Sequence, residues 1–477
     1  MQLAPALPPV PHPARPDASA SASGPADPES PAIIIRTATP DGSAGRGGRD
    51  VHRVLLVHNR YQRPGGEDHV FETEAALLDA GGHAVARLEM HNDAANGLSK
   101  AELARRTVWS REGHRAVEAA ARAHRADVVH FHNTLPLVSP AGYYGARAAG
   151  AAVVQTIHNF RLVCPAAVLF RDGHVCESCV GKTLALPGVR HGCYRGSRAA
   201  TLAVATMTAV HHALGTWATA VDRYIAITPF MRDTLARGGY DAGRIAVKAN
   251  TLPKMPPLAT RGGGTVVFAS RLDAGKGVET LVRAWETHAD LPPLVVAGDG
   301  ALADLVRAAA ERLGPAPDGT PRVRFVGWQT AAALNALRET ADAFVFPSEW
   351  YEGGTPIAFV ESIARGLPVV ASDIPTVRGM VRDGEEGRLF AAGDADALAA
   401  AVRDVMADPR RRDAMSDAAR RTAERNHSPL ATLLALRRIY AEAVAVRHPE
   451  RRPDVPAGPL APAAGAPAVS EPTPAHA

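Results

Sequence analysis

Cysteine is scarce in this chain, which has only four among its 477 residues. A small secreted protein held together by disulfides carries more of them, spread through a shorter sequence. The first residues, MQLAPALPPVPHPARPD, also lack a basic stretch followed by an apolar one, so no signal peptide is expected. Together these absences favour a cytoplasmic protein.

Dense basic runs with interleaved aromatic residues are absent as well. Lys and Arg number 53 against 49 Asp and Glu, which gives a formal net charge of +4. This mild excess suits an anionic ligand or a phospholipid surface, but it does not indicate binding to nucleic acid.

Charged side chains are missing from residues 199–221, and this segment is long enough to raise the question of a membrane span. It consists mainly of Ala and Thr, however, and it contains the pair His211 and His212. The composition therefore favours a buried or interface-lying helix over a transmembrane one.

The remaining composition is that of a globular protein, with 46% hydrophobic and 21% charged residues. The length exceeds that of one compact domain, so two ordered domains are expected. Residues 1–50 and 449–477 are rich in Ala and Pro and are predicted to be disordered tails. A break at residues 252–264 separates an N-terminal domain, 51–255, from a C-terminal domain, 262–430, which a helix at 431–448 follows.

Both halves alternate apolar runs typical of strands with periodic stretches typical of helices. The expected strands are 53–58, 84–88, 127–131, 152–157, 223–227 and 245–248 in the first half, and 265–268, 294–297, 323–326, 343–346 and 368–371 in the second. This alternation predicts an α/β protein with two doubly wound parallel sheets. A ligand would bind at the carboxyl ends of the strands, in the cleft between the domains.

Two glycines, Gly65 and Gly66, follow the first strand and precede a helix. Such a pair lets backbone N–H groups approach the anionic oxygens of a ligand, although a plain tight turn has the same composition. In the second half, Gly298, Asp299 and Gly300 resemble the start of a dinucleotide-binding fingerprint. The next strand ends without an acidic residue for a ribose, so a nicotinamide cofactor is not expected.

Charged residues also follow two strands of the second half. Arg271 and Lys276 flank a glycine-containing turn before a helix, which suits a diphosphate as it gains charge; two solvated surface cations are the alternative. Glu352 follows another strand and Glu361 lies on the next helix, where carboxylates can accept hydrogen bonds from sugar or ribose hydroxyls. The alternative is a solvated helix face.

In this order the motifs resemble those of the retaining glycosyltransferases of family 4, whose two Rossmann-like, doubly wound domains face each other across a cleft in the GT-B fold. The resemblance covers residues 53–445. It implies catalytic roles for His158, Arg271, Lys276 and Glu352. It implies donor-binding roles for Gly65, Gly66, Gly354, Thr355 and Glu361. The family usually has one residue fewer between its two glutamates, and Gly353–Gly354 is where this chain gains it.

The resemblance further implies transfer of a sugar from a nucleotide-sugar donor to a carbohydrate or lipid-linked acceptor, with retention and without a catalytic metal. Arg271 and Lys276 would neutralise the leaving diphosphate, and His158 would contact the donor sugar. The paired acids Asp394 and Asp396 precede a helical stretch and are predicted to cap it rather than bind metal. A sugar-nucleotide 2-epimerase and a non-catalytic sugar-nucleotide-binding protein are the alternatives.

The four cysteines lie close together in residues 160–195. Cys176 and Cys179 form a CxxC pair, and Cys164 and Cys193 flank it at a spacing suited to a structural zinc ion. Unliganded reduced thiols are the alternative. This segment resembles a bacterial subgroup of the family associated with surface polysaccharides.

A basic stretch at residues 100–115 raises the prospect of peripheral membrane contact at the inner face of the plasma membrane. On a helix, Arg105, Arg106 and Trp109 could face lipid. A solvated helix face is the alternative.

Overall fold

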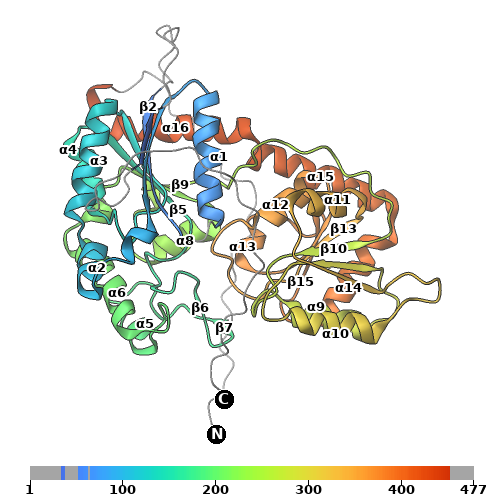
Figure 1. The fold of residues 1–477 in the computed structure, drawn as a ribbon. Helices are drawn as coiled ribbons and strands as arrows, with labels where there is room; N and C mark the ends of the chain where they lie inside the picture. Colours follow the sequence, from blue (N-terminus) through green and yellow to red (C-terminus); the bar gives the residue numbers. More distant parts are fainter. Residues whose placement is uncertain (1–33, 38–51, 63–64, 452–477) are drawn as a thin grey trace, which may run out of the picture.

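The computed structural model describes residues 34–37, 52–62 and 65–451, which form two α/β units (Figure 1). The first unit contains a seven-stranded sheet in the order β1-β3-β2-β4-β5-β8-β9, and the second a six-stranded sheet in the order β12-β11-β10-β13-β14-β15. Apart from β1, neighbouring strands are parallel in both sheets. The prediction of two doubly wound parallel sheets is confirmed.

The strands of the first sheet begin and end close to the predicted positions. They are β2 (Arg53–Arg60), β3 (Ala84–His91), β4 (Val128–Phe131), β5 (Ala152–Ile157), β8 (Arg223–Ala226) and β9 (Ile245–Val247). One strand was not predicted: β1 (Ile34–Thr37) pairs antiparallel with β3, inside the segment expected to be disordered. The backbone groups of β1 find their hydrogen-bonding partners on the edge of β3. The sequence of four residues alone does not show such a distant partner.

The second sheet consists of β10 (Val266–Ala269), β11 (Leu294–Ala297), β12 (Val323–Gly327), β13 (Ala343–Phe346), β14 (Val369–Ser372) and β15 (Gly387–Phe390). The sequence analysis missed β15, because its residues GRLF lack a continuous apolar run. The strand order reverses between β10 and β13. A doubly wound sheet binds its ligands outside the carboxyl ends of the strands at such a point.

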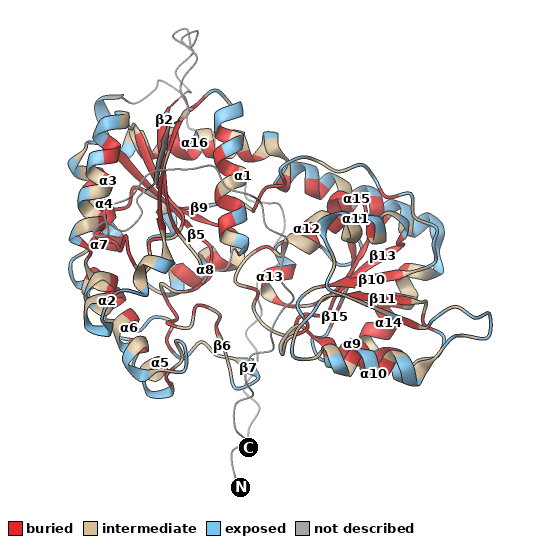
Figure 2. Ribbon diagram, in the orientation of Figure 1, coloured by how far each residue is buried: buried red, intermediate tan, exposed pale blue. Residues whose placement is uncertain are grey.

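Helices cover both faces of each sheet and turn their buried sides toward it (Figure 2). In the first unit they are α1 (Gly66–Ala80), α2 (Lys100–Val108), α3 (Arg111–His124), α4 (Ala141–Ala148), α5 (Leu186–His191), α6 (Arg198–Ala213), α7 (Thr216–Thr219) and α8 (Pro229–Arg237). In the second they are α9 (Val278–Thr287), α10 (Ala303–Leu313), α11 (Ala331–Thr340), α12 (Ile357–Ala364), α13 (Pro375–Arg378), α14 (Ala395–Ala407) and α15 (Pro409–His427). The side chain of Asp394 accepts a hydrogen bond from the Ala397 N–H, which confirms the predicted N-cap of α14.

The final helix, α16 (Pro429–Arg447), returns from the second unit to the first (Figure 1). Pro429 starts it, and the Ser428 side chain caps it by accepting from the Ala431 N–H. Leu436 and Tyr440 are fully buried in an apolar cluster with residues of β2 and α1. Residues 449–451, expected to belong to a disordered tail, form the short helical turn η3 (Pro449–Arg451) against α16. Residues 1–33, 38–51 and 452–477, the rest of both expected tails, lie outside the described residues.

Residues 199–221 form most of α6 and all of α7, with a buried face that includes Val204, Met207 and Trp217. The predicted buried helix is therefore present. Within the described ranges, no helix combines the length and apolar character needed to cross a bilayer.

Candidate active site

The loops that follow β10 and β13 pack directly against each other at the point where the strand order of the second sheet reverses. Gly277 makes this approach possible: its φ is +71°, and a Cβ there would lie only 1.8 Å from the Pro347 carbonyl oxygen. Gly277 also precedes the first residue of α9, so the N-terminus of that helix lies beside the junction of the two loops. Lys276 is thereby brought to Glu352.

Lys276 and Glu352 form an ion pair at this junction, and further hydrogen bonds hold its carboxylate. The Lys276 Nζ atom lies 2.7 and 2.8 Å from the two carboxylate oxygens of Glu352. Ser348 Oγ and Trp350 Nε1 donate to the same carboxylate at 2.7 and 3.0 Å. The Lys276 and Glu352 side chains are only 11% and 8% exposed. The carboxylate is thus held in one orientation by three donors, two of which the sequence analysis did not identify.

Arg271 occupies a different environment on the same loop. Its side chain is 70% exposed and contacts Asp273 at 3.0 Å. In the sequence Arg271 and Lys276 look like a similar pair of cations. In the structure Lys276 is a nearly buried partner of Glu352, and Arg271 is a solvent-facing guanidinium.

Glu361 lies one turn into α12 and binds Arg338 of α11, with 2.9 Å between the carboxylate and the guanidinium. The Arg338 side chain is only 1% exposed, so its charge requires a partner in the fold. Glu361 therefore has a structural role here. Its predicted contact with a donor ribose stays a prediction.

Gly354 and Thr355 connect the second unit to the first. Thr355 Oγ1 donates to the carbonyl of Ile227 at 3.2 Å, and Asn250 Nδ2 donates to the Thr355 carbonyl at 3.4 Å. A Cβ at Gly354 would lie 3.6 Å from the carbonyl oxygen of His158. The loop that carries Glu352 is therefore placed against the end of β5, beside His158.

His158 follows β5 and is buried. Its Nε2 atom lies 3.1 Å from His132 Nδ1, and the two rings stack with centroids 5.3 Å apart. Burial lowers the pKa of His158 below its ordinary value, although Glu67 and Glu74 oppose that shift. A neutral imidazole can still accept or donate one hydrogen bond to a ligand.

A buried acid–base group lies behind His158. Lys248 Nζ is 2.5 Å from Glu74 Oε1, and the second Glu74 oxygen is 3.8 Å from His132 Nε2. Burial raises the pKa of Glu74, but attraction to Lys248 and His130 and the Lys248 hydrogen bond outweigh it, so the pKa lies below its ordinary value. Glu74, His130 and His132 have metal-ligand atoms within 4.8 Å of one another, but the Lys248 ammonium already neutralises the carboxylate.

This buried group was not predicted from the sequence, although signals for it exist there. Glu74 falls in the buried stripe of α1 with Val70, Phe71 and Leu78, where a carboxylate needs a partner. Lys248 ends the predicted strand 245–248.

The glycine pair shapes the start of α1. The Gly65 N–H donates to Asp68 Oδ2 at 2.8 Å, and Asp68 Oδ1 lies 2.9 Å from His58 Nε2. A Cβ at Gly66 would meet no atom within 4 Å, so packing does not require a glycine there. Asn159, next to His158, donates to Glu67 Oε1 at 2.7 Å and joins this helix start to the His158 loop.

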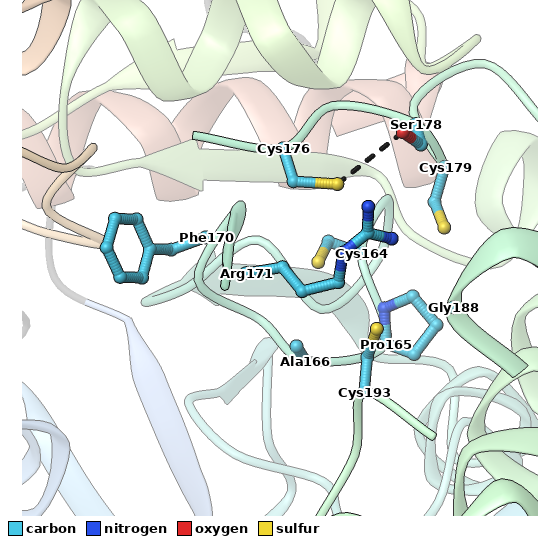
Figure 3. Close-up of a pocket in the computed structure, with 10 residues that line it drawn as sticks. All are labelled: Cys164, Pro165, Ala166, Phe170, Arg171, Cys176, Ser178, Cys179, Gly188 and Cys193. Atoms are coloured by element: carbon cyan, nitrogen blue, oxygen red, sulfur yellow. Dashed lines mark hydrogen bonds between the residues drawn. The ribbon is translucent and has the colours of Figure 1, made fainter. Parts of the chain in front are cut away.

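The four cysteines gather around one small cavity in the first unit, together with Arg171 (Figure 3). All four are free thiols. They come from three places in the chain: the loop after β5, the segment after the hairpin β6 (Phe170–Arg171) and β7 (His174–Val175), and the end of α5. The predicted cluster therefore exists as a spatial group.

The predicted lipid-facing group at residues 100–115 is only partly present. The Trp109 ring stacks on His211 at 5.9 Å and contacts Tyr144 at 5.3 Å, so it packs against the protein instead of facing outward. Arg106 is engaged by Glu102 and Glu112. The prediction considered one helix by itself. In the structure α4 and α6 pack beside it, and Trp109 turns toward them.

Known structures with the same architecture share the GT-B fold seen here. Anabaena HepE in complex with UDP aligns with a TM-score of 0.55 at 16% identity, over 80% of this chain and 98% of the other. Sucrose-phosphate synthase of Thermosynechococcus elongatus aligns with a TM-score of 0.57 at 17% identity, over 82% and 99%. At these identities the likeness establishes the fold alone, and this chain has the GT-B fold.

Sequence relatives lead from the fold to a family. The model of the family "Glycosyl transferases group 1" matches residues 257–422. A phosphatidyl-myo-inositol mannosyltransferase of Mycobacterium leprae is 36% identical over 174 residues, which are 34% of this chain and 44% of the relative. The lipopolysaccharide core biosynthesis glycosyltransferase LpsE of Rhizobium meliloti is 36% identical over 169 residues, 35% and 44%. Residues 257–422 are thus similar to the glycosyl transferases group 1 family, and the chain spans about half the length of the curated relatives it matches.

Proposed function

We propose that this protein transfers a sugar from a nucleoside diphosphate sugar to a carbohydrate or lipid-linked acceptor. The observation that carries the proposal is the Lys276–Glu352 pair, held at the reversal point of the second sheet and next to His158 of the first unit. It combines a cation for a diphosphate with a fixed carboxylate for a sugar hydroxyl. Relatives named for glycolipid and lipopolysaccharide synthesis support an acceptor of the cell envelope.

The donor diphosphate is proposed to bind at the loop of residues 271–277. The Lys276 ammonium, the Arg271 guanidinium and the N-terminus of α9 are three positive groups on or next to this loop. As the bond to the sugar breaks, negative charge grows on the diphosphate, and positively charged groups that are already positioned lower the barrier. These groups supply the neutralisation that a divalent cation provides in other transferases, so we propose a metal-independent reaction.

The donor sugar is proposed to lie between the Glu352 loop and His158. The His158 carbonyl is directed to the Gly353–Gly354 segment, and its ring is neutral at physiological pH because burial lowers its pKa. A carbonyl or neutral imidazole can stabilise positive charge that develops on the sugar without adding a cation of its own. We propose retention of anomeric configuration, with the acceptor entering from the first unit.

A transfer assay without and with a chelator tests this proposal. The purified protein would be incubated with GDP-mannose or UDP-glucose, donors that the names of related proteins mention, and a crude glycolipid acceptor. We expect nucleoside diphosphate release and a glycosylated product, unchanged by brief treatment with EDTA. Activity that disappears with EDTA and returns with Mg²⁺ or Mn²⁺ would refute metal independence; release of an isomerised free sugar without transfer would point to an epimerase.

For a lipid-linked acceptor we propose peripheral contact with the inner face of the plasma membrane through α2 and α3. The exposed side chains of Arg105, Arg111 and Arg115 line one hollow between these helices together with Glu112, and Arg105 is also paired with Glu102. Several arginines on one surface attract anionic lipid headgroups, each by about 1 kcal/mol at the membrane surface.

A further inference from the structure

The four cysteines line a cavity of about 20 Å³, roughly the space of one water molecule or one metal ion, and no three of their sulfurs lie within 4.8 Å of one another (Figure 3). Cys164 and Cys179 are buried, and Cys176 and Cys193 are half-buried. Cys164 and Leu169 belong to the large apolar core of the first unit, whereas Cys179 lies in a small cluster whose other buried members are Ala185 and Ala205. Burial therefore offers the part of the segment around Cys179 little compensation for its ordering entropy.

The backbone around the thiols is already arranged to support sulfur ligands. The backbone N–H groups of Ser178 and Gly188 bond to the sulfurs of Cys176 and Cys179, respectively. The CxxC segment closes in a tight turn, with the Val180 N–H donating to the Glu177 carbonyl at 2.9 Å. At Gly188 a Cβ would approach Cys179 Sγ to 3.3 Å, so the absence of a side chain there leaves room for that sulfur.

We propose that Cys164, Cys176, Cys179 and Cys193 bind one structural Zn²⁺ ion. Four thiolates satisfy tetrahedral zinc completely and leave no position for a catalytic water. Binding requires the sulfurs to close to about 2.3 Å from the ion, with Arg171 outside the ligand shell. A zinc ion with four thiolates carries two net negative charges, and the Arg171 guanidinium, which lines the same cavity, offsets part of them.

The segment that carries the four cysteines also contacts the second unit, and we call this contact the brace. Phe170, next to Arg171 on the hairpin, packs edge-to-face on Trp350 of the second unit, with centroids 5.5 Å apart. Trp350 in turn donates to Glu352 and lies under the Lys276 ammonium, 4.9 Å from the ring centroid. Zinc in the first unit would therefore help to position Lys276 and Glu352 in the second unit, through Phe170 and Trp350. This inference rests on the proposed function.

A second connection leads from the CxxC turn to the same loop. Glu177, between the two cysteines, forms a double hydrogen bond with Arg237 of α8, at 2.6 and 3.0 Å. At the other end of α8, the Phe230 ring packs on Tyr351 with centroids 4.6 Å apart. The segment therefore reaches the Trp350–Tyr351–Glu352 loop at two points.

The metal site can be tested without measuring any activity. Protein purified without a metal-binding tag should contain about one zinc per chain, and X-ray absorption should show four sulfur neighbours at about 2.3 Å. Exchange of zinc for Co²⁺ should produce the charge-transfer absorption of cobalt thiolates. Substoichiometric zinc together with four freely titrating thiols, or with a disulfide, would overturn the site. Cys176→Ser should lose the metal; because this variant can misfold, the wild-type measurements carry the decision.

The brace is tested with variants that leave all four thiols in place. Phe170→Ala should keep one zinc per chain and weaken binding of the nucleotide sugar about two- to tenfold, as expected for the loss of one aromatic pair. Leu186→Ala, an exposed leucine on α5, is the matched control and should bind the donor like the wild type. Unchanged donor affinity in Phe170→Ala would overturn the brace. If the wild type binds no nucleotide sugar at all, the proposed function fails while the zinc measurement still stands.

Discussion

At the scale of single residues, the environment of each charged group decides what its loss would do. Lys276 has a carboxylate partner, a tryptophan face beneath it and little contact with water, whereas Arg271 extends into solvent. Both are proposed to bind the same diphosphate. Their variants should therefore agree in catalysis and differ in stability.

Arg271→Ala and Lys276→Ala should each lower turnover about a hundredfold, the effect of removing one positioned charge from a developing anion. Arg271→Ala should leave the melting temperature unchanged because its side chain is 70% exposed. Lys276→Ala should lower it, because Glu352 would keep a nearly buried carboxylate without its cation. Arg283→Ala, an exposed arginine on α9, is the control for both. A wild-type rate in Arg271→Ala would remove that residue from the diphosphate site.

Lys248→Met should lower the free energy of unfolding by about 3–5 kcal/mol, because it leaves the Glu74 carboxylate buried and unpaired. The double variant Glu74→Gln, Lys248→Met removes both charges and should recover most of that loss. Urea denaturation with constant m-values would measure both changes. Equal destabilisation of the single and double variants would show that the methionine itself, not the unpaired charge, is responsible.

At the scale of secondary-structure elements, the loops at strand ends bear the proposed chemistry, and α2 and α3 bear the proposed membrane contact. Trp109 is turned toward His211, so membrane insertion by an aromatic anchor is not expected. The side chains that stay exposed on these helices include the charged Arg105, Arg111 and Arg115. Any association with lipid should therefore be electrostatic.

The wild type should sediment with vesicles that contain anionic phospholipid at low salt and should be released as salt is raised, because screening weakens surface attraction. The double variant Arg111→Glu, Arg115→Glu should lose most of this binding. Arg410→Glu, which reverses an exposed arginine on α15, is the control at a distant surface. Failure of the wild type to sediment would identify the α2–α3 arginines as an ordinary solvated surface.

At the scale of the whole molecule, α16 joins the two units by packing against the first sheet after α15 has packed in the second unit. Buried histidines lie along this junction. His130 bonds to Tyr440 of α16 at 2.9 Å, and His427 bonds to the Asn250 carbonyl at 2.8 Å in the connection between the units. His130 and His427 are 0% and 2% exposed, so a charged ring would be cut off from water.

Lowering the pH below about 6.5 should therefore lower the free energy of unfolding. Burial lowers the pKa of His130 to about 3 and that of His427 to about 4, against about 6.5 in the unfolded chain. Between those values the unfolded chain binds more protons, so the free energy of unfolding falls as pH falls from about 6.5. Each histidine contributes about 1.4 kcal/mol per pH unit in its range.

Urea denaturation at several pH values between 7 and 5 would measure this slope. His427→Asn should reduce it, whereas His69→Asn, at an exposed position of α1, should leave it unchanged. A stability that is independent of pH over this range would contradict neutral burial of these imidazoles.

The sequence by itself determined the alternation of strands and helices, because the apolar period of each segment is a local property. It also placed Gly65, Arg271, Lys276 and Glu352 in loops that follow strands, and parallel strands bring such loops to one edge of a sheet. The cap at Asp394 was equally local, since its partner is three residues away. By contrast, β1 and β15 were missed because their pairing partners, rather than their own residues, stabilise them.

Only the tertiary structure decided which charges meet. Lys276 and Glu352 are 76 residues apart in sequence, and Glu74 and Lys248 are 174 apart, so no local period relates them. Arg271 and Lys276 look alike in sequence, but Arg271 is exposed to water and Lys276 is nearly buried. Trp109, predicted to face outward, packs against His211. The physical reason is that ion pairing and desolvation depend on neighbours in space, which strand order and domain packing create.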